Sequence, residues 1–288
     1  MKDTRTHISR LHFATPEEQE KILDELDHLG FFMLPDENWS MFTERISLLQ
    51  KVLGEIESGK IPPELRSHIQ FREKISGDFT AEANRKLMEH YKFRNSWAPA
   101  FFSKEETGSF SAGVQLEVDE TYPVIFLHDA FAEKNSHCGY DRTEILAHEL
   151  IHAAKMFFPP SRYEEYFTCH IYKSPLRRWM GNLFRSKYLI TPFLAGFFGG
   201  SVSVSLGIPW GGFCFLLPVL ILLYELHLYL RLAAAGKKLL LLQLDPLPVL
   251  LRLTDQEIFA LGKMPVESGA DLAKNSLRWK IFFRKFHL

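Results

Sequence analysis

Apolar residues in the first third of the chain recur every three or four positions, a spacing typical of helices that bury one face. Thr15 is expected to cap the first helix, and Gly30 to end it. Two further amphipathic helices are predicted at about residues 40–57 and 80–91. No motif with a chemical role occurs in these helices. We therefore predict an N-terminal helical region over residues 1–95 that serves packing.

The pattern changes to strands in the next segment. Apolar and polar residues alternate over residues 111–118, with Val114 and Leu116 on one side and Gln115 on the other, as expected of an edge strand. Residues 124–127 are a continuous apolar run, which favours a covered central strand. A small sheet is therefore predicted directly before the next helix.

That helix, predicted over residues 141–157, contains the sequence His148-Glu149-Leu150-Ile151-His152. Side chains four positions apart lie on one face of a helix, so the two imidazoles point the same way and can bind one metal ion. Glu149 follows the first histidine and would lie beside the open position of the metal, where a general base is needed. Asp141 and Glu144 form the pattern of a capping box at the helix start.

This HExxH pattern resembles the zincin metallopeptidases. The resemblance implies an α+β zincin-like core, here residues 96–180, with Zn²⁺ held by His148 and His152 and with Glu149 as the catalytic residue. It also implies that the edge strand lines the substrate, which makes Gln115 a candidate for the cleft.

The segment after Pro160 is expected to supply the third zinc ligand, because catalytic zinc usually has three protein ligands and one open position. Ser161 and Glu164 fit a capping box, which leaves Glu165 free to reach the metal. Zincins of the gluzincin branch use a glutamate on a following helix in this way, so Glu165 is the preferred ligand. Glu164 and His170 remain alternatives for the third ligand. Tyr163, Tyr166 and His170 are candidate hydrogen-bond donors to the transition state.

Residues 188–224 lack charged side chains. This run is too long for one membrane span of roughly 20 residues, and its middle is rich in glycine. We predict a transmembrane helical hairpin over residues 188–231, with spans at about 188–206 and 213–231. Lysine and arginine flank both ends, so both ends are expected to face the cytoplasm.

Net charge, cysteine content and the N-terminal sequence give further information about which functions to expect. The net charge is −1, which gives no indication of nucleic-acid binding. The cysteines number three and are scattered, so no disulfide framework is expected. The N-terminus lacks the apolar run of a signal peptide. Residues 239–288 are predicted to form a C-terminal helical region close to the membrane.

The sequence thus predicts a membrane-anchored zinc metallopeptidase that acts on peptide or protein substrates, including membrane-proximal ones, with its site in the cytoplasm. The alternative is a membrane-anchored scaffold without catalysis and with a structural metal or none. The paired hydrophobic segments resemble those of bacterial inclusion-membrane proteins, which recruit partners. A fourth protein ligand, such as Cys169 or His170, would favour the scaffold, because it would close the position needed for catalysis.

Overall fold

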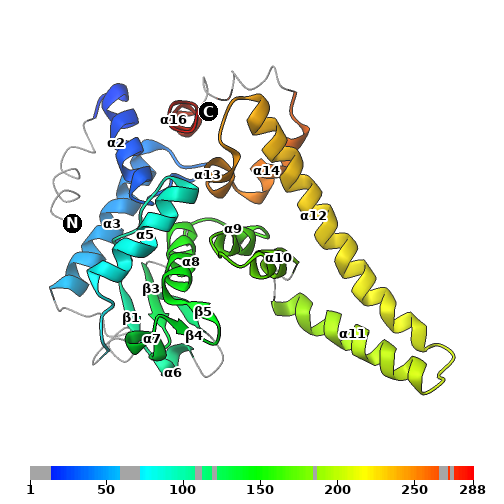
Figure 1. Cartoon of the computed structure of the whole chain (residues 1–288). Helices are drawn as coiled ribbons and strands as arrows, with labels where there is room; N and C mark the ends of the chain where they lie inside the picture. Colours follow the sequence, from blue (N-terminus) through cyan, green and yellow to red (C-terminus); the bar gives the residue numbers. More distant parts are fainter. Residues whose placement is uncertain are drawn as a thin grey trace.

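The computed structural model describes residues 14–58, 72–107, 112–118, 122–183, 187–265, 272 and 276–288. It has an α+β fold in which helices surround a small mixed sheet (Figure 1). This agrees with the α+β class expected from the sequence.

Three helices form the N-terminal part: α2 (Pro16–His28), α3 (Trp39–Glu57) and α5 (Gly77–Tyr91). The predicted start of α2 is confirmed, since Thr15 and Glu18 form a capping box there. Gly30 has a φ of +83°, the left-handed conformation that suits glycine at a helix end. The buried apolar stripes of these helices face the sheet and the helices of the C-terminal part.

The sheet has the order β1-β3-β2, with β1 at Ala100–Phe102, β2 at Gly113–Val118 and β3 at Tyr122–Leu127. β3 is the central strand and all its residues are buried, as its continuous apolar run predicts. β2 pairs antiparallel with β3 at the edge, and β1 pairs parallel with it. The short helix α6 (Lys104–Thr107) lies between β1 and β2 in the chain. Three short elements follow β3: α7 (Ala130–Glu133), β4 (Ser136–His137) and β5 (Tyr140–Asp141).

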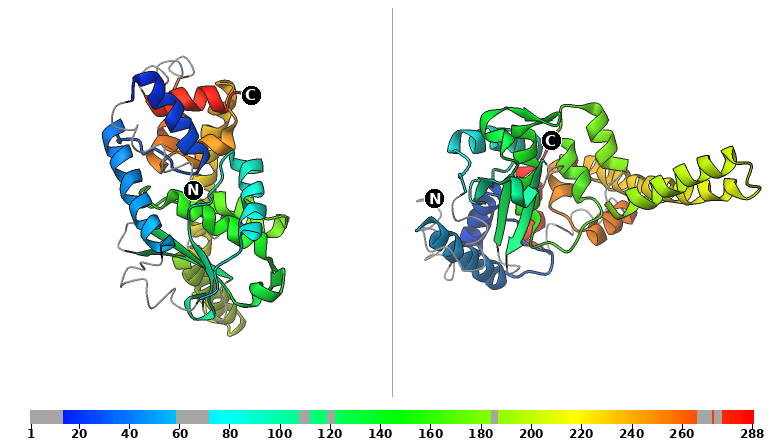
Figure 2. Two further views of the ribbon diagram at one scale, coloured as in Figure 1. Left: turned by 90° about the vertical axis from the view of Figure 1, so that its left-hand side faces the viewer. Right: turned by 90° about the horizontal axis from the view of Figure 1, so that it is seen from below.

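Helix α8 (Arg142–Lys155) lies on this sheet, in contact with β2, β3 and α5. Two shorter helices, α9 (Glu164–His170) and α10 (Pro175–Leu183), follow, and α9 packs against both α8 and α10. Figure 2 shows the sheet on one side of the molecule and a long pair of helices projecting from the other.

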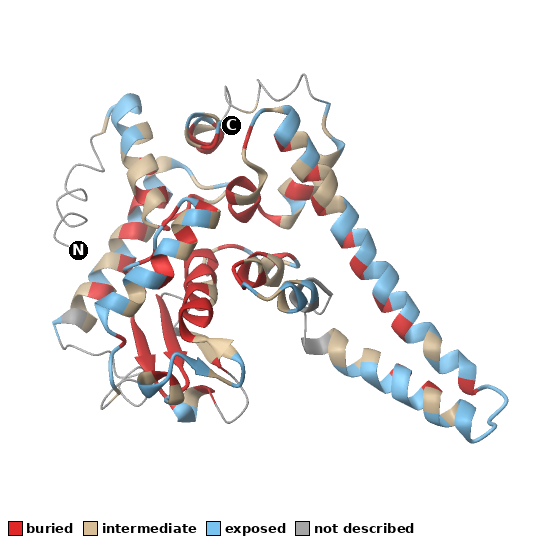
Figure 3. Ribbon diagram, in the orientation of Figure 1, coloured by how far each residue is buried: buried red, intermediate tan, exposed pale blue. Residues whose placement is uncertain are grey.

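The projecting pair consists of α11 (Lys187–Ser205) and α12 (Leu216–Leu241), joined through the 3₁₀ helix η1 (Gly211–Phe215). Gly196 and Gly200 permit close packing, since a Cβ at Gly196 would lie 2.6 Å from Pro218 and one at Gly200 3.0 Å from the Phe215 ring. Most large apolar side chains of this pair are exposed (Figure 3).

The predicted pair of equal membrane spans needs correction. Among the described residues, one helical stretch, Gly211–Leu241, is long and apolar enough to cross a membrane. The apolar part of α11, Leu189–Ser205, is shorter. The second helix also continues beyond residue 231, because its last three turns bury Leu232, Ala235 and Leu239 in the protein core instead of ending at a bilayer surface.

The C-terminal helices are α13 (Pro246–Leu251), α14 (Asp255–Lys263) and α16 (Leu277–Lys285). They belong to the same hydrophobic core as the N-terminal helices and the sheet. The buried guanidinium of Arg252 joins the two ends of the chain by binding Asp27 of α2 at 2.6 Å and 3.0 Å. The described parts of the regions expected at residues 1–95 and 239–288 therefore pack into one hydrophobic core.

Candidate metal centre

The two histidines of the motif lie on the side of α8 that faces α9. Asp141 caps α8 by accepting a hydrogen bond from the backbone of Glu144, as predicted. The Glu144 side chain does not complete the expected capping box, because its carboxylate accepts hydrogen bonds from the Lys86 ammonium and the Lys173 backbone. The apolar residues of α8 pack on the sheet and α5, which leaves its histidine face to α9.

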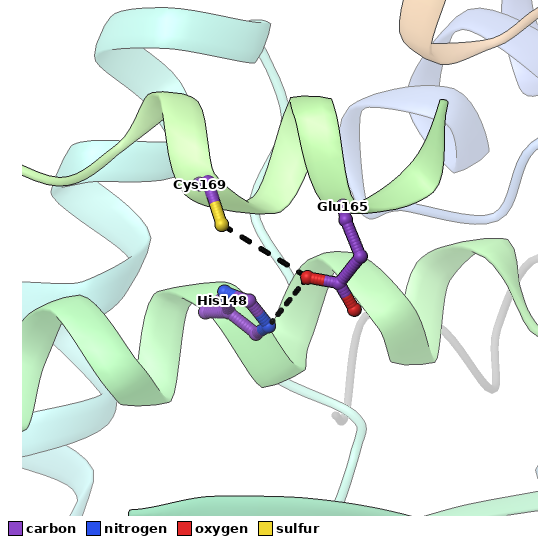
Figure 4. A group of neighbouring side chains, drawn as sticks. All are labelled: His148, Glu165 and Cys169. Carbon is purple, nitrogen blue, oxygen red and sulfur yellow. Dashed lines mark hydrogen bonds and ion pairs between the residues drawn. The ribbon is translucent and has the colours of Figure 1, made fainter. Parts of the chain in front are cut away.

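His148, His152 and Glu165 converge between α8 and α9. The Nε2 atoms of the two histidines are 3.1 Å apart. The Glu165 carboxylate of α9 lies 3.7 Å from Nε2 of His148 through one oxygen and 3.6 Å from Nε2 of His152 through the other. Figure 4 shows Glu165 and His148 pointing toward each other from the two helices.

The spacing of these ligand atoms suits a zinc ion. Zinc–ligand bonds of about 2.0–2.1 Å at tetrahedral angles place neighbouring ligand atoms about 3.3–3.4 Å apart. The three observed separations, 3.1, 3.6 and 3.7 Å, lie on either side of that value. Two imidazole nitrogens and a carboxylate are also a donor set that zinc accepts. The residues present therefore fit the metal that the motif implies.

Both histidines are held through their other ring nitrogens. Glu164 lies 2.6 Å from Nδ1 of His152, and the hydroxyl of Tyr172 lies 2.9 Å from Nδ1 of His148. Such partners fix the ring orientation, so that Nε2 of each ring points at the shared space. Protein metal sites commonly support histidine ligands in this way.

The predicted role of Glu164 in a capping box is wrong. Helix α9 begins at Glu164 itself, after Tyr163, and the Ser161 hydroxyl donates to Asp255 of α14 instead of capping α9 at Glu164. The later start turns the Glu164 side chain toward α8. The sequence analysis also missed Tyr172, which follows α9 and meets His148 only through tertiary packing.

The two histidines differ in charge. Burial and the neighbouring His152 hold the pKa of His148 well below its ordinary value, so His148 is neutral. Burial also disfavours charge on His152, but the hydrogen bond and charge of Glu164 outweigh it and raise the pKa of His152 to about 9. Without a metal ion, one cationic ring thus faces one neutral ring, and the charge of His152 is paired with the Glu164 carboxylate 2.6 Å away.

Glu149 lies on the sheet side of α8. Its side chain is buried beside β2, since a Cβ at Gly113 would lie 3.0 Å from one of its carboxylate oxygens. Burial raises the pKa of Glu149 to about 7. A carboxyl group with a pKa near neutrality can both take and return a proton, which is the property of a general base and acid.

Cys169 lies one turn after Glu165 on α9, on the side that faces His148 (Figure 4). Its thiol is 3.9 Å from the Glu165 carboxylate, and suitable atoms of His148, Glu165 and Cys169 lie within 4.8 Å of one another (Figure 4). Burial raises the pKa of the Cys169 thiol to about 12. The thiol is therefore protonated in this arrangement.

The other candidates lie elsewhere. The ring of His170 packs edge-on against His90, with centroids 5.9 Å apart. The hydroxyl of Tyr163 donates to the carbonyl of Leu228 on α12. Gln115 is half-buried in β2, where its backbone pairs with Ile125. The structure thus brings together His148, His152 and Glu165, and separates His170 and Tyr163 into other contacts.

Comparison with known proteins found no matching family model, no matching curated protein and no matching solved structure.

Proposed function

We propose that the protein is a membrane-anchored zinc metallopeptidase. The observation that carries this proposal is the convergence of the His148 and His152 Nε2 atoms on the Glu165 carboxylate, with Nδ1 of each ring held by a separate partner. His148, His152 and Glu165 would hold Zn²⁺, and Glu149 would be the catalytic residue.

A bound zinc ion supplies Lewis-acid chemistry, because it lowers the pKa of water toward about 7 and polarises a carbonyl. Glu149 takes the proton of the attacking water and passes it to the leaving amine. Its pKa of about 7 suits both transfers near neutral pH. Glu164 and Tyr172 hold the two imidazoles in place through their Nδ1 atoms.

The edge strand β2 is the proposed binding surface for an extended peptide. It lies at the margin of the sheet, in contact with α8, and Gly113 at its start lies against Glu149. An extended substrate can add to such an edge through backbone hydrogen bonds. The substrate would then run beside the general base.

The membrane anchor is proposed to be the hairpin of α11 and α12. Gly211–Leu241 has 31 residues, whereas a span needs roughly 20, and only 22% of its most apolar window is buried. The apolar part of α11 is somewhat short, so it crosses with α12 as a closely packed pair or enters only part of the bilayer. The basic residues beside both ends favour a cytoplasmic location for the site.

The proposal is tested by Glu149→Gln in the full chain, purified in detergent and loaded with zinc. We expect peptide hydrolysis to fall by about 10²–10⁴-fold, because a general base is lost, while one zinc ion per chain is retained. Glu144→Gln is the matched control, since it removes another buried carboxylate from α8, one that binds Lys86 and the Lys173 backbone and does not approach the two histidines. Equal activity of wild type and Glu149→Gln would reject the proposed role.

One observation supports the alternative, a membrane-anchored scaffold with a structural metal. Cys169 lies close enough to His148 and Glu165 to be considered as a fourth ligand. A zinc site with four protein ligands is closed and lacks the position needed for catalysis. The Cys169→Ala variant distinguishes the metallopeptidase from the scaffold. A catalytic site keeps its zinc and activity in this variant, whereas a structural site loses zinc affinity.

A further inference from the structure

Helix α10 faces outward with its apolar side. Leu176 and Trp179 are three positions apart on one face, and their exposed fractions are 63% and 59%. The basic residues between them turn the other way. The Arg177 guanidinium stacks on the ring of Tyr140 at 3.9 Å, and Arg178 is half-buried.

This arrangement is the reverse of that of an ordinary surface helix, which buries its apolar face and exposes its charges. Full burial of a large apolar side chain contributes about 1.5–3 kcal/mol. Leu176 and Trp179 forgo most of this stabilisation in water. A missing apolar partner for this face is the simplest physical explanation.

The position of α10 in the chain indicates the partner. The helix ends at Leu183, and α11, with exposed apolar side chains such as Phe197 and Phe198, begins at Lys187. Helix α10, with the exposed Leu176 and Trp179, thus comes directly before the hairpin in the chain. Tryptophan is the side chain enriched where membranes meet water.

We propose that α10 lies in the lipid–water interface, with Leu176 and Trp179 inserted among the lipids and its arginines held on the protein. Helices of this kind insert their apolar face about 5–10 Å into the headgroup region. This proposal rests on the proposed membrane insertion of the hairpin and is independent of zinc.

The contact between α9 and α10 gives the inference a consequence for the substrate. Helix α9 carries Glu165 and packs directly on α10. An interfacial α10 would hold the proposed metal site between α8 and α9 beside the bilayer surface. The preferred substrates would then be peptide segments that emerge from the same membrane.

The test uses the full chain in nanodiscs of phosphatidylcholine and phosphatidylglycerol. Trp179→Cys is labelled with an environment-sensitive fluorophore in a background where the exposed Cys138 and Cys214 are replaced by serine. We expect stronger quenching by lipids with a nitroxide near the headgroup than by lipids with a nitroxide deep in the acyl chain, because the expected depth is about 5–10 Å.

Labels at two control positions distinguish insertion of α10 from insertion of the hairpin alone and from nonspecific contact with lipid. The same label at Leu48→Cys on α3, another exposed leucine, should show no quenching. The label at Leu220→Cys on α12 should be quenched more by the deep nitroxide. Quenching at position 220 without quenching at 179 would overturn the role of α10 and leave the anchor intact. Quenching at neither position would overturn both, and quenching at all three positions would mean nonspecific contact and would also reject the proposal.

Discussion

The side-chain cluster between α8 and α9 differs from the usual distribution of polar and apolar groups in one way, and the hairpin of α11 and α12 differs from it in the opposite way. On the α9 side of α8, two histidines and the carboxylate of Glu164 lie largely out of water, and Glu149 is buried on the sheet side of the same helix. In the hairpin, leucine, phenylalanine and valine side chains are exposed (Figure 3). Buried ionisable groups need a partner of opposite charge, and exposed apolar surface needs an apolar environment. We propose a different binding component for each region: a metal ion for the site between α8 and α9, and lipid for the hairpin.

The two regions are joined by direct contacts. Tyr163, the residue before Glu164, is buried and donates a hydrogen bond to the carbonyl of Leu228 in α12. Helix α12 then continues into the core and packs on α14. The base of the hairpin is therefore packed against the part of the molecule that carries the side chains of the site.

The largest expected effect is on membrane insertion, when an arginine is introduced into the hairpin. Leu220→Arg should weaken membrane insertion by about 2.5–3.5 kcal/mol if the residue lies near the bilayer centre. Leu48→Arg on α3 is the control, since surface substitutions usually change stability by less than about 0.5 kcal/mol. Insertion is measured by carbonate extraction and glycosylation mapping. Equal insertion of the two variants would refute the lipid environment of α12.

A smaller effect, on zinc affinity, is expected when the hydrogen-bond partners of the two histidines are replaced. Glu164→Gln and Tyr172→Phe should each weaken zinc affinity by about 10–100-fold, because the rings lose the contacts that orient them. Competition with a chromophoric chelator measures the affinity.

Tyr91→Phe is the matched control for the tyrosine, because its hydroxyl donates to the backbone of α9 at Phe167 and reaches neither histidine. If Tyr91→Phe lowered zinc affinity as much as Tyr172→Phe, the loss would reflect the packing of α9 and not the hydrogen bond to His148.

The smallest expected effect is the release of a proton from His152 when zinc binds. The pKa of His152, about 9, is raised above the ordinary value of 6.5, so the ring is protonated at pH 8 in metal-free protein. Zinc requires the neutral ring, so its binding at pH 8 should release about one proton from this residue. Calorimetry in buffers of different ionisation enthalpy measures that number, and zinc affinity should rise with pH until about 9. In Glu164→Gln the release should decrease, because the group that raises the pKa is gone. An unchanged release in that variant would contradict the assignment to His152.

Local patterns explain how much of this structure can be predicted from sequence. The spacing of His148 and His152 places both rings on one helical face, and the run at 124–127 identifies the central strand. These features depend on the period of a single element. The place of Glu165 near both rings follows from its position early in the next helix.

The role of Glu164 could not be predicted, because it depends on where α9 begins and on how α9 packs against α8. A helix start moved by a few residues changes which side chain faces the neighbour, since each residue turns the helix by about 100°. Tyr172 meets His148 across 24 positions of chain and carries no local signal. The length of α12 also could not be predicted, because the sequence does not distinguish leucines that pack in the protein core from leucines at an exposed apolar surface.

The most direct test of the metal centre is a zinc titration of the full chain by native mass spectrometry, with Glu165→Ala and Cys169→Ala compared. We predict one zinc ion per wild-type chain, loss of tight binding in Glu165→Ala and unchanged binding in Cys169→Ala. A folded wild-type chain that binds no zinc, or a Glu165→Ala variant that binds zinc as tightly as wild type, would contradict the proposed centre.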